Sequence, residues 1–99
     1  MHVRAATVQI QSGKIQEFIK AYDSLVPDLK AQKGYQGSYL MTDAGSGKAL
    51  SISVWETEAD MLASESDGGY VKEQQAKIGV LFAGPPELEH YELSSENSA

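Results

Sequence analysis

Apolar and polar residues alternate along the start of the chain. Between Val3 and Gln11, the side chains of Ala6, Val8 and Ile10 fall on one face, while threonine and glutamine fall on the other. Successive side chains of a β-strand point to opposite faces of its sheet, so a period of two is typical of a strand with one buried face. The pattern therefore predicts that the chain begins with a strand.

The pattern then changes to that of an amphipathic α-helix. Apolar residues recur at helical spacing, at Ile15, Phe18, Ile19, Tyr22, Leu25, Val26 and Leu29. Charged side chains occupy the opposite face. Ser12 precedes this helix and is predicted to cap it, while Lys30 and Gly34 suit its C-terminal end. Pro27 lacks an amide hydrogen, so we expect it to kink the helix.

Two further strands follow the helix. Residues 35–42 and 49–56 have strand-like composition, and the segment that joins them, Asp-Ala-Gly-Ser-Gly-Lys, contains two glycines. Glycine adopts the positive φ angles that tight turns require, so the two strands are predicted to pair as an antiparallel hairpin. Thr57, with Asp60 three residues later, resembles a capping box that opens a second helix.

Two adjacent glycines, Gly68 and Gly69, interrupt the second helical region. A further helical stripe follows them, made of Tyr70, Gln74, Ile78, Leu81 and Phe82. Gly84-Pro85-Pro86 ends this stripe, and residues 88–93 are predicted to form a closing strand. We therefore expect a single domain over residues 1–93, followed by a disordered polar tail at residues 94–99.

The predicted elements have the order of a ferredoxin-like α+β fold. The order β-α-β-β-α-β with right-handed crossovers gives a four-stranded antiparallel sheet that carries two helices on one face. The strand at residues 49–55 has leucine, isoleucine and valine on one side, and small residues with Trp55 on the other. Neither side is typical of a face exposed to water. A second copy of the chain is the simplest cover for the face without helices, so we expect a homodimer.

Composition limits the partners and the compartment. The 8 basic and 14 acidic side chains give a formal net charge of −6 at pH 7. Such a surface repels phosphate backbones, so we expect no nucleic-acid partner. Cysteine is absent, which excludes a disulfide framework and fits a reducing compartment. No stretch approaches the ~20 apolar residues of a membrane span. We therefore expect a cytoplasmic protein that does not bind membranes.

Four short motifs are spread over nearly the whole chain. They are Phe18-x3-Tyr22, Leu29-x4-Gly34-Tyr35, Gly37-Ser38-Tyr39-Leu40 and, most specifically, Ser51-Ile52-Ser53-Val54-Trp55-Glu56-Thr57-Glu58-Ala59. Together they resemble the antibiotic biosynthesis monooxygenase (ABM) family of dimeric α/β-barrel proteins. The resemblance implies a homodimer whose two sheets face each other as a barrel, with a pocket in each subunit between sheet and helices. Members include enzymes that oxidise aromatic polyketides to quinones with oxygen and no metal or flavin, haem-degrading enzymes, and proteins of unknown role.

The resemblance also indicates where chemistry would lie. In quinone-forming members, a strand tryptophan works with an asparagine upstream, a tyrosine in the following helix and an arginine further along. This sequence keeps the tryptophan as Trp55. At the other positions it offers Ser51, Met61 or Leu62, and Gln74 or Gln75.

Haem degradation and a metal site are both disfavoured. The haem-degrading branch needs an axial histidine on the second helix, and residues 59–83 contain none. His2 and His90 are expected to be solvated or to lie on edge strands, and no further ligands accompany them at metal-binding spacing. We therefore expect no metal and no other cofactor.

Six residues are candidates for lining a substrate pocket. They are Trp55, Ser51, Ser53, Tyr70, Met61 and Phe82. Trp55 shares its strand face with small side chains that would leave space beside its ring; the alternative is that it packs in the core with its indole N–H bonded locally. Tyr70, beside the two glycines, is a candidate gate, with an ordinary interrupted helix as the alternative. Helical spacing favours a core position for Phe82.

The sequence contains one cation on an otherwise apolar strand face. Arg4 either binds an anionic substrate group or pairs with a carboxylate across the dimer, and we favour the second. The acidic residues near the second helix, Glu56, Glu58, Asp60, Glu65 and Asp67, need no role beyond capping and solubility. No residue is assigned as catalytic.

Two functions follow from these observations. The leading hypothesis is a cofactor-independent monooxygenase-family protein that binds a small apolar or aromatic substrate in the helix–sheet pocket. The retained Trp55 and the small residues beside it favour this hypothesis. The alternative is a non-catalytic, dimeric ligand-binding or stress-related module of the same fold, which the changed asparagine, tyrosine and arginine positions favour. Haem degradation is a distant third.

Overall fold

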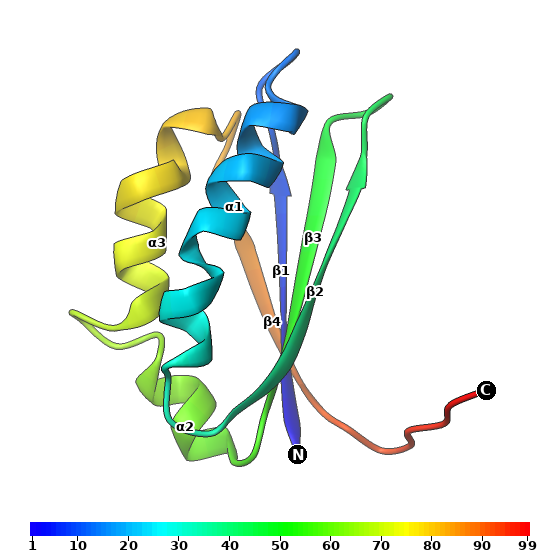
Figure 1. Cartoon of the computed structure of the whole chain (residues 1–99), viewed down its shortest axis with the longest axis vertical. Coiled ribbons are helices and arrows are strands. Elements are labelled where there is room, and N and C mark those ends of the chain that lie inside the picture. The colour runs from blue at the N-terminus through cyan, green and yellow to red at the C-terminus, as the bar shows by residue number, and fades with distance from the viewer.

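One face of a four-stranded sheet carries all the helices (Figure 1). The computed structural model describes residues 1–99. In chain order the elements are β1 (His2–Gln9), α1 (Ile15–Lys30), β2 (Tyr35–Asp43), β3 (Lys48–Trp55), α2 (Glu58–Ala63), α3 (Tyr70–Ile78), the 3-10 turn η1 (Gly79–Leu81) and β4 (Glu87–Glu92). The strands lie in the order β2-β3-β1-β4, and every neighbouring pair is antiparallel. The predicted ferredoxin-like fold is confirmed.

The second helical region is divided into two helices. α2 and α3 are separated by a turn at residues 64–69, in which Gly68 has a φ of 79°. α3 ends at Ile78, earlier than the stripe up to Phe82 predicts. Phe82 instead pairs with Ile10 in an isolated antiparallel bridge beyond the end of β1. Phe82 therefore continues the sheet and does not belong to a helix, and it packs against the core from there.

One of the two predicted helix caps is present. The Thr57 Oγ1 atom accepts a hydrogen bond from the Asp60 amide at 3.1 Å, as the sequence predicts. The predicted cap by Ser12 is wrong, because α1 begins after Lys14, whose own side chain makes no capping bond. A turn at Ser12 and Gly13, where Gly13 has a φ of 77°, separates the serine from the helix.

The core lies between the sheet and the helices in two clusters. The larger cluster contains Val8, Ile10, Ile15, Phe18, Tyr22, Leu25, Ala49 and Ile78. The smaller cluster contains Leu29, Trp55, Met61, Tyr70 and Val71. The larger cluster joins α1 to the middle of the sheet, whereas the smaller one joins α2 and the start of α3 to the end of β3.

The sheet face opposite the helices carries an apolar patch beside Glu87 and Glu89 of β4. Because Arg4 and Val8 point toward the helices, strand alternation directs Val3, Ala5 and Thr7 of β1 to the other side. We define the outer sheet face by its apolar members, which are Val3, Ala5, Tyr39, Met41, Leu50, Ile52, Val54 and Tyr91. Tyr39 is 68% exposed and Tyr91 is 52% exposed. A contiguous apolar patch of this kind typically marks an interaction surface.

Gly34, between α1 and β2, lies against α2 in a conformation that disfavours any other residue. Its φ is +83°, and a Cβ atom added there would lie 2.7 Å from the Cβ of Asp60. We expect Gly34→Ala to lower the free energy of unfolding by about 1–3 kcal/mol, because left-handed backbone and crowding both oppose the new methyl group. Gly79→Ala is the matched control, since its φ is −60° and an added Cβ meets nothing within 4 Å. Urea unfolding of both variants measures the difference, and equal losses would contradict this account.

Candidate functional site

A cavity of about 50 Å³ lies between the sheet and the helices. Most of its wall is apolar, with side chains from all four strands and from α1 and α3 among the lining residues. Its polar lining residues are Arg4, Tyr22, Ser51, Ser53, Tyr70, Gln74 and Gln75. An apolar cavity with a few convergent polar groups is the usual composition of a small-molecule site.

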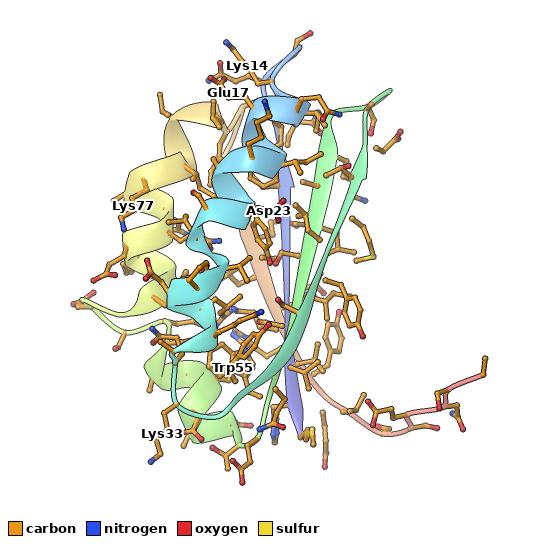
Figure 2. All side chains as sticks on the ribbon, in the orientation of Figure 1. Lys14, Glu17, Asp23, Lys33, Trp55 and Lys77 are labelled. Carbon is orange, nitrogen blue, oxygen red and sulfur yellow. The ribbon has the colours of Figure 1, made fainter.

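The structure brings four of the six predicted pocket residues to this cavity. They are Ser51, Ser53, Tyr70 and Phe82. Trp55 and Met61 are not part of the wall. Trp55 is 0% exposed, and it lies between the sheet and the helices (Figure 2). Its Nε1 atom donates to the Ser53 Oγ atom at 2.9 Å, which is the packed arrangement that the sequence left open as an alternative.

Arg4 brings a buried positive charge to the cavity. Although Arg4 is charged, only 5% of the residue is exposed. Its Nη1 atom lies 2.6 Å from the Ser64 Oγ atom and 3.3 Å from the Glu65 Oε2 atom. Burial lowers the pKa of Arg4 and Glu65 opposes this shift, so the guanidinium stays charged at neutral pH.

Trp55 supports this guanidinium from within the core. The Cζ atom of Arg4 lies 5.2 Å from the centroid of the Trp55 ring. A cation over an aromatic face is attracted by the quadrupole of the ring, and the attraction increases where water is excluded. The structure thus places Trp55 against Arg4 and not in the wall of the cavity.

The carboxylate that pairs with Arg4 belongs to the same chain. The expected pairing across a dimer is therefore wrong, because Glu65, just after α2, makes the ion pair. Glu65 is shared with His90 of β4, whose Nε2 atom lies 2.8 Å from Oε2 and 3.0 Å from Oε1. The sequence offered one signal, a cation on an apolar face that needs a partner. It did not indicate which acid, because the register that pairs His90 with Arg4 becomes visible only in the sheet.

Tyr70, which lines the same cavity, has an unpaired hydroxyl. The residue is 5% exposed, and its hydroxyl oxygen is the one buried side-chain polar atom without a hydrogen-bond partner. Burial raises the pKa of Tyr70 above its usual value, so the phenol stays protonated and can donate a hydrogen bond. A buried polar group without a partner costs about 1–3 kcal/mol, which makes this hydroxyl a feature that needs an explanation.

A larger groove adjoins the cavity. It lies between α1 and β2 and has a volume of about 360 Å³. Tyr22 and Leu40 line both the groove and the cavity. The Tyr22 hydroxyl lies 3.0 Å from the Ser51 Oγ atom, so a hydrogen-bonded side chain helps to separate the two spaces. The cavity alone has room for a few water molecules, whereas ligand pockets usually measure about 300–1,000 Å³.

The two histidines are engaged away from the cavity wall. His90 contacts Glu65 as described, and the His2 Nε2 atom lies 3.3 Å from the Glu58 Oε2 atom. No group of three or more histidine, cysteine, aspartate or glutamate side chains is arranged to hold a metal ion. None of the helices has the length and apolar character needed to cross a membrane.

The antiparallel β2-β3-β1-β4 sheet, with helices on one face and a cavity beneath them, defines the class of ferredoxin-like α+β proteins with a helix–sheet pocket. Within this class, the chain belongs to the antibiotic biosynthesis monooxygenase family, whose model matches residues 1–75. The family resemblance of the sequence motifs is thereby confirmed.

A curated relative is similar over nearly the whole of this chain. The uncharacterised protein Rv2557 of Mycobacterium tuberculosis is 30% identical over 96 residues, which are 96% of this chain but 42% of that protein. The chain thus spans less than half the length of this relative.

Solved structures share the fold at low sequence identity. A Streptomyces coelicolor monooxygenase from the gene ActVA-Orf6, in complex with the ligand nanaomycin D, superposes with a TM-score of 0.81 at 12% identity, covering 99% of this chain and 91% of that one. A Bordetella bronchiseptica protein named for the same family gives a TM-score of 0.80 at 20% identity, covering 95% and 97%.

Proposed function

We propose that this chain binds a small, largely apolar aromatic substrate between its sheet and helices, and acts on it as a cofactor-independent monooxygenase. The observation that carries the proposal is the cavity, whose apolar wall ends at the buried charge of Arg4 and the hydroxyl of Tyr70. The ligand bound by the S. coelicolor monooxygenase supports a small-molecule site in this fold.

Ligand entry requires part of the wall to move, because the cavity of about 50 Å³ is smaller than any aromatic substrate. Tyr22 is the residue we propose as the gate. The open groove lies on its far side, and its one polar contact is the hydrogen bond to Ser51. Rotation of its ring would join the groove to the cavity. Tyr70, the gate that the sequence suggested, belongs to the smaller core cluster and lines the cavity, so a ligand-contacting role suits it better.

The polar groups suit an anionic intermediate. In an oxygenation of this kind, a ring methylene loses a proton, the carbanion reacts with O₂, one oxygen atom is retained as a carbonyl and the other leaves as water. The negative charge of the carbanion is delocalised onto a neighbouring oxygen, where Arg4 and Tyr70 would stabilise it. The protein would thus contribute positioning and electrostatics.

A second candidate function is a non-catalytic, dimeric ligand-binding or stress-related module. One observation favours it: no histidine, aspartate or glutamate lines the cavity, so the wall lacks the side chains that most often act as general bases. An oxygenase built on this cavity would have to pass the substrate proton to solvent. Haem degradation has less support, since neither His2 nor His90 lines the cavity.

We also propose that the chain forms a homodimer through its outer sheet face, and that it works in the cytoplasm. The exposed Tyr39, Met41 and Tyr91 on a face without helices support the dimer. The absence of cysteine supports a reducing compartment.

A panel of hydroxylated anthrones, quinols and naphthols tests the function, with quenching of Trp55 fluorescence as the binding signal and an oxygen electrode for turnover. We expect at least one compound to bind and to consume oxygen above its background rate. Binding without oxygen consumption would support the non-catalytic module, and neither signal from any compound would overturn both functions.

A cavity-filling substitution tests where the ligand binds. Ala6 lines the cavity, and the three additional carbons of Ala6→Leu would occupy most of its volume. We expect this variant to bind the panel at least about tenfold more weakly, because the ligand loses that space. Val80→Leu, at a position 77% exposed and outside the wall, is the control and should bind normally. Equal binding by both variants would place the ligand elsewhere.

A further inference from the structure

We propose that the polar end of the cavity is a carboxylate site, so that the preferred ligands are aromatic acids. The free edge of the Arg4 guanidinium and the Tyr70 hydroxyl hold the carboxylate, and the ring lies against the apolar wall. This inference rests on the proposed function only in requiring that a ligand enters this cavity.

The first support is the way in which Arg4 is bonded. Its hydrogen bonds to Ser64, Glu65 and the Met61 carbonyl all come from one atom, Nη1. The Nε and Nη2 atoms make no hydrogen bond within the chain. The Nε and Nη2 atoms lie on one edge of the guanidinium, and their N–H groups point in the same direction. Two parallel donors of this kind match the two oxygens of a carboxylate.

A purely structural role for Arg4 explains only part of this geometry. Nη1 fixes the end of α2 to the sheet through Ser64 and Met61, and this anchor needs one nitrogen. It leaves unexplained why Arg4 also lines the cavity and why its Nε and Nη2 atoms make no hydrogen bond within the chain. The charge comes from β1, whereas the family resemblance would put an arginine at Gln74 or Gln75 of α3, which line the same cavity.

The second, independent support is Tyr70. Its side chain lines the same cavity, and its hydroxyl is buried without a hydrogen-bond partner. A phenylalanine would fill the same space without the cost of an unpaired polar group. A protonated phenol beside a guanidinium adds a third donor, and a carboxylate has lone pairs for three or more donors. A carboxylate therefore satisfies both unpaired features at once.

The surrounding charge permits an anion here. Glu65 is the one carboxylate in contact with Arg4, and it lies on the Nη1 side and is shared with His90. The Nε–Nη2 edge faces no acid of the chain within hydrogen-bond distance. The protein has a net charge of −6, but at this edge an anion is attracted by the positive charge of Arg4, a residue that is 5% exposed.

Three matched probes test the site by isothermal titration calorimetry at neutral pH: 2-naphthoate, the uncharged 2-naphthamide and 2-naphthol. They share one ring system and differ in the polar group. We expect naphthoate to bind at least about tenfold more tightly than either of the others, as a charge-assisted, bidentate contact allows.

Two variants locate the effect. Tyr70→Phe should weaken naphthoate binding about tenfold, leave naphthamide binding within a factor of about three, and keep or raise the melting temperature. Arg4→Lys keeps the charge but loses the fork, and should reduce the preference for naphthoate over naphthamide about tenfold. Val80→Leu, at a position that is 77% exposed and outside the wall, is the control and should bind all three probes like the unmodified protein.

The outcomes separate this inference from the proposed function. If all three probes bind equally well, or if Tyr70→Phe binds naphthoate like the unmodified protein, the carboxylate site is overturned and the aromatic pocket stands. A preference for naphthol equal to that for naphthoate also overturns it. If no probe binds, the pocket and the carboxylate site fail together.

Discussion

The variant Ile52→Glu should be a monomer at concentrations where the unmodified protein is a dimer. Ile52 lies at the centre of the outer sheet face, where it pairs with Ala5 of β1 and Tyr39 of β2. A contact between identical faces about a twofold axis brings the central residues of the two copies together. Glutamate there would place two unpaired carboxylates in the interface, each at a cost of about 3–5 kcal/mol. The dissociation constant should therefore rise by a factor of about 1,000 or more.

Light scattering coupled to gel filtration at micromolar concentration measures this change. The unmodified protein should have about twice the chain mass of 10.7 kDa, whereas Ile52→Glu should have the mass of one chain. The fold should persist, because Ile52 belongs to neither core cluster. Gln16→Glu, which adds the same charge on the exposed side of α1, should remain a dimer. A monomeric unmodified protein would refute the proposed dimer.

The predictable part of the fold depends on local patterns. The hairpin of β2 and β3 follows from two strand-like runs and a glycine-containing turn, in which Gly47 has a φ of 76°. The start of α2 follows from Thr57, whose hydroxyl oxygen needs only the amide three residues later. Ser12 shows the limit of this approach. A suitable capping residue cannot act when a turn lies between it and the helix.

The candidate site was less predictable, because it depends on packing between distant segments. Small residues on the face of β3 did predict space, and Ser51 and Ser53 do line a cavity. The sequence could not show that Ser53 would also accept the indole N–H of Trp55 and so help to hold the ring in the core. The cavity opens instead beside Arg4 and Tyr70. Alternation along β1 placed Arg4 on the right face, but the partners of Arg4 come from segments about 60 residues away.

The ion pair of Arg4 and Glu65 should show the largest coupling in the stability of the domain. Glu65→Leu removes the only carboxylate in contact with a guanidinium that is 5% exposed. An uncompensated buried charge usually costs about 3–5 kcal/mol. The Met61 carbonyl, the Ser64 hydroxyl and the Trp55 ring still solvate Arg4, so we expect a loss near the lower limit, about 3 kcal/mol.

Arg4→Met in the Glu65→Leu background should recover most of that loss. With both charges gone, methionine can fill the space above Trp55, and buried ion pairs replaced by apolar side chains of similar volume are often neutral in stability. Urea unfolding of the four proteins in this double-mutant cycle gives the coupling energy, provided that the slopes with denaturant agree. Additive losses would show that Glu65 does not compensate Arg4, and that the charge of Arg4 is balanced by groups other than this carboxylate. Recovery of stability together with loss of the preference for naphthoate would separate the two edges of the guanidinium, since Nη1 holds α2 and the opposite edge would hold the ligand.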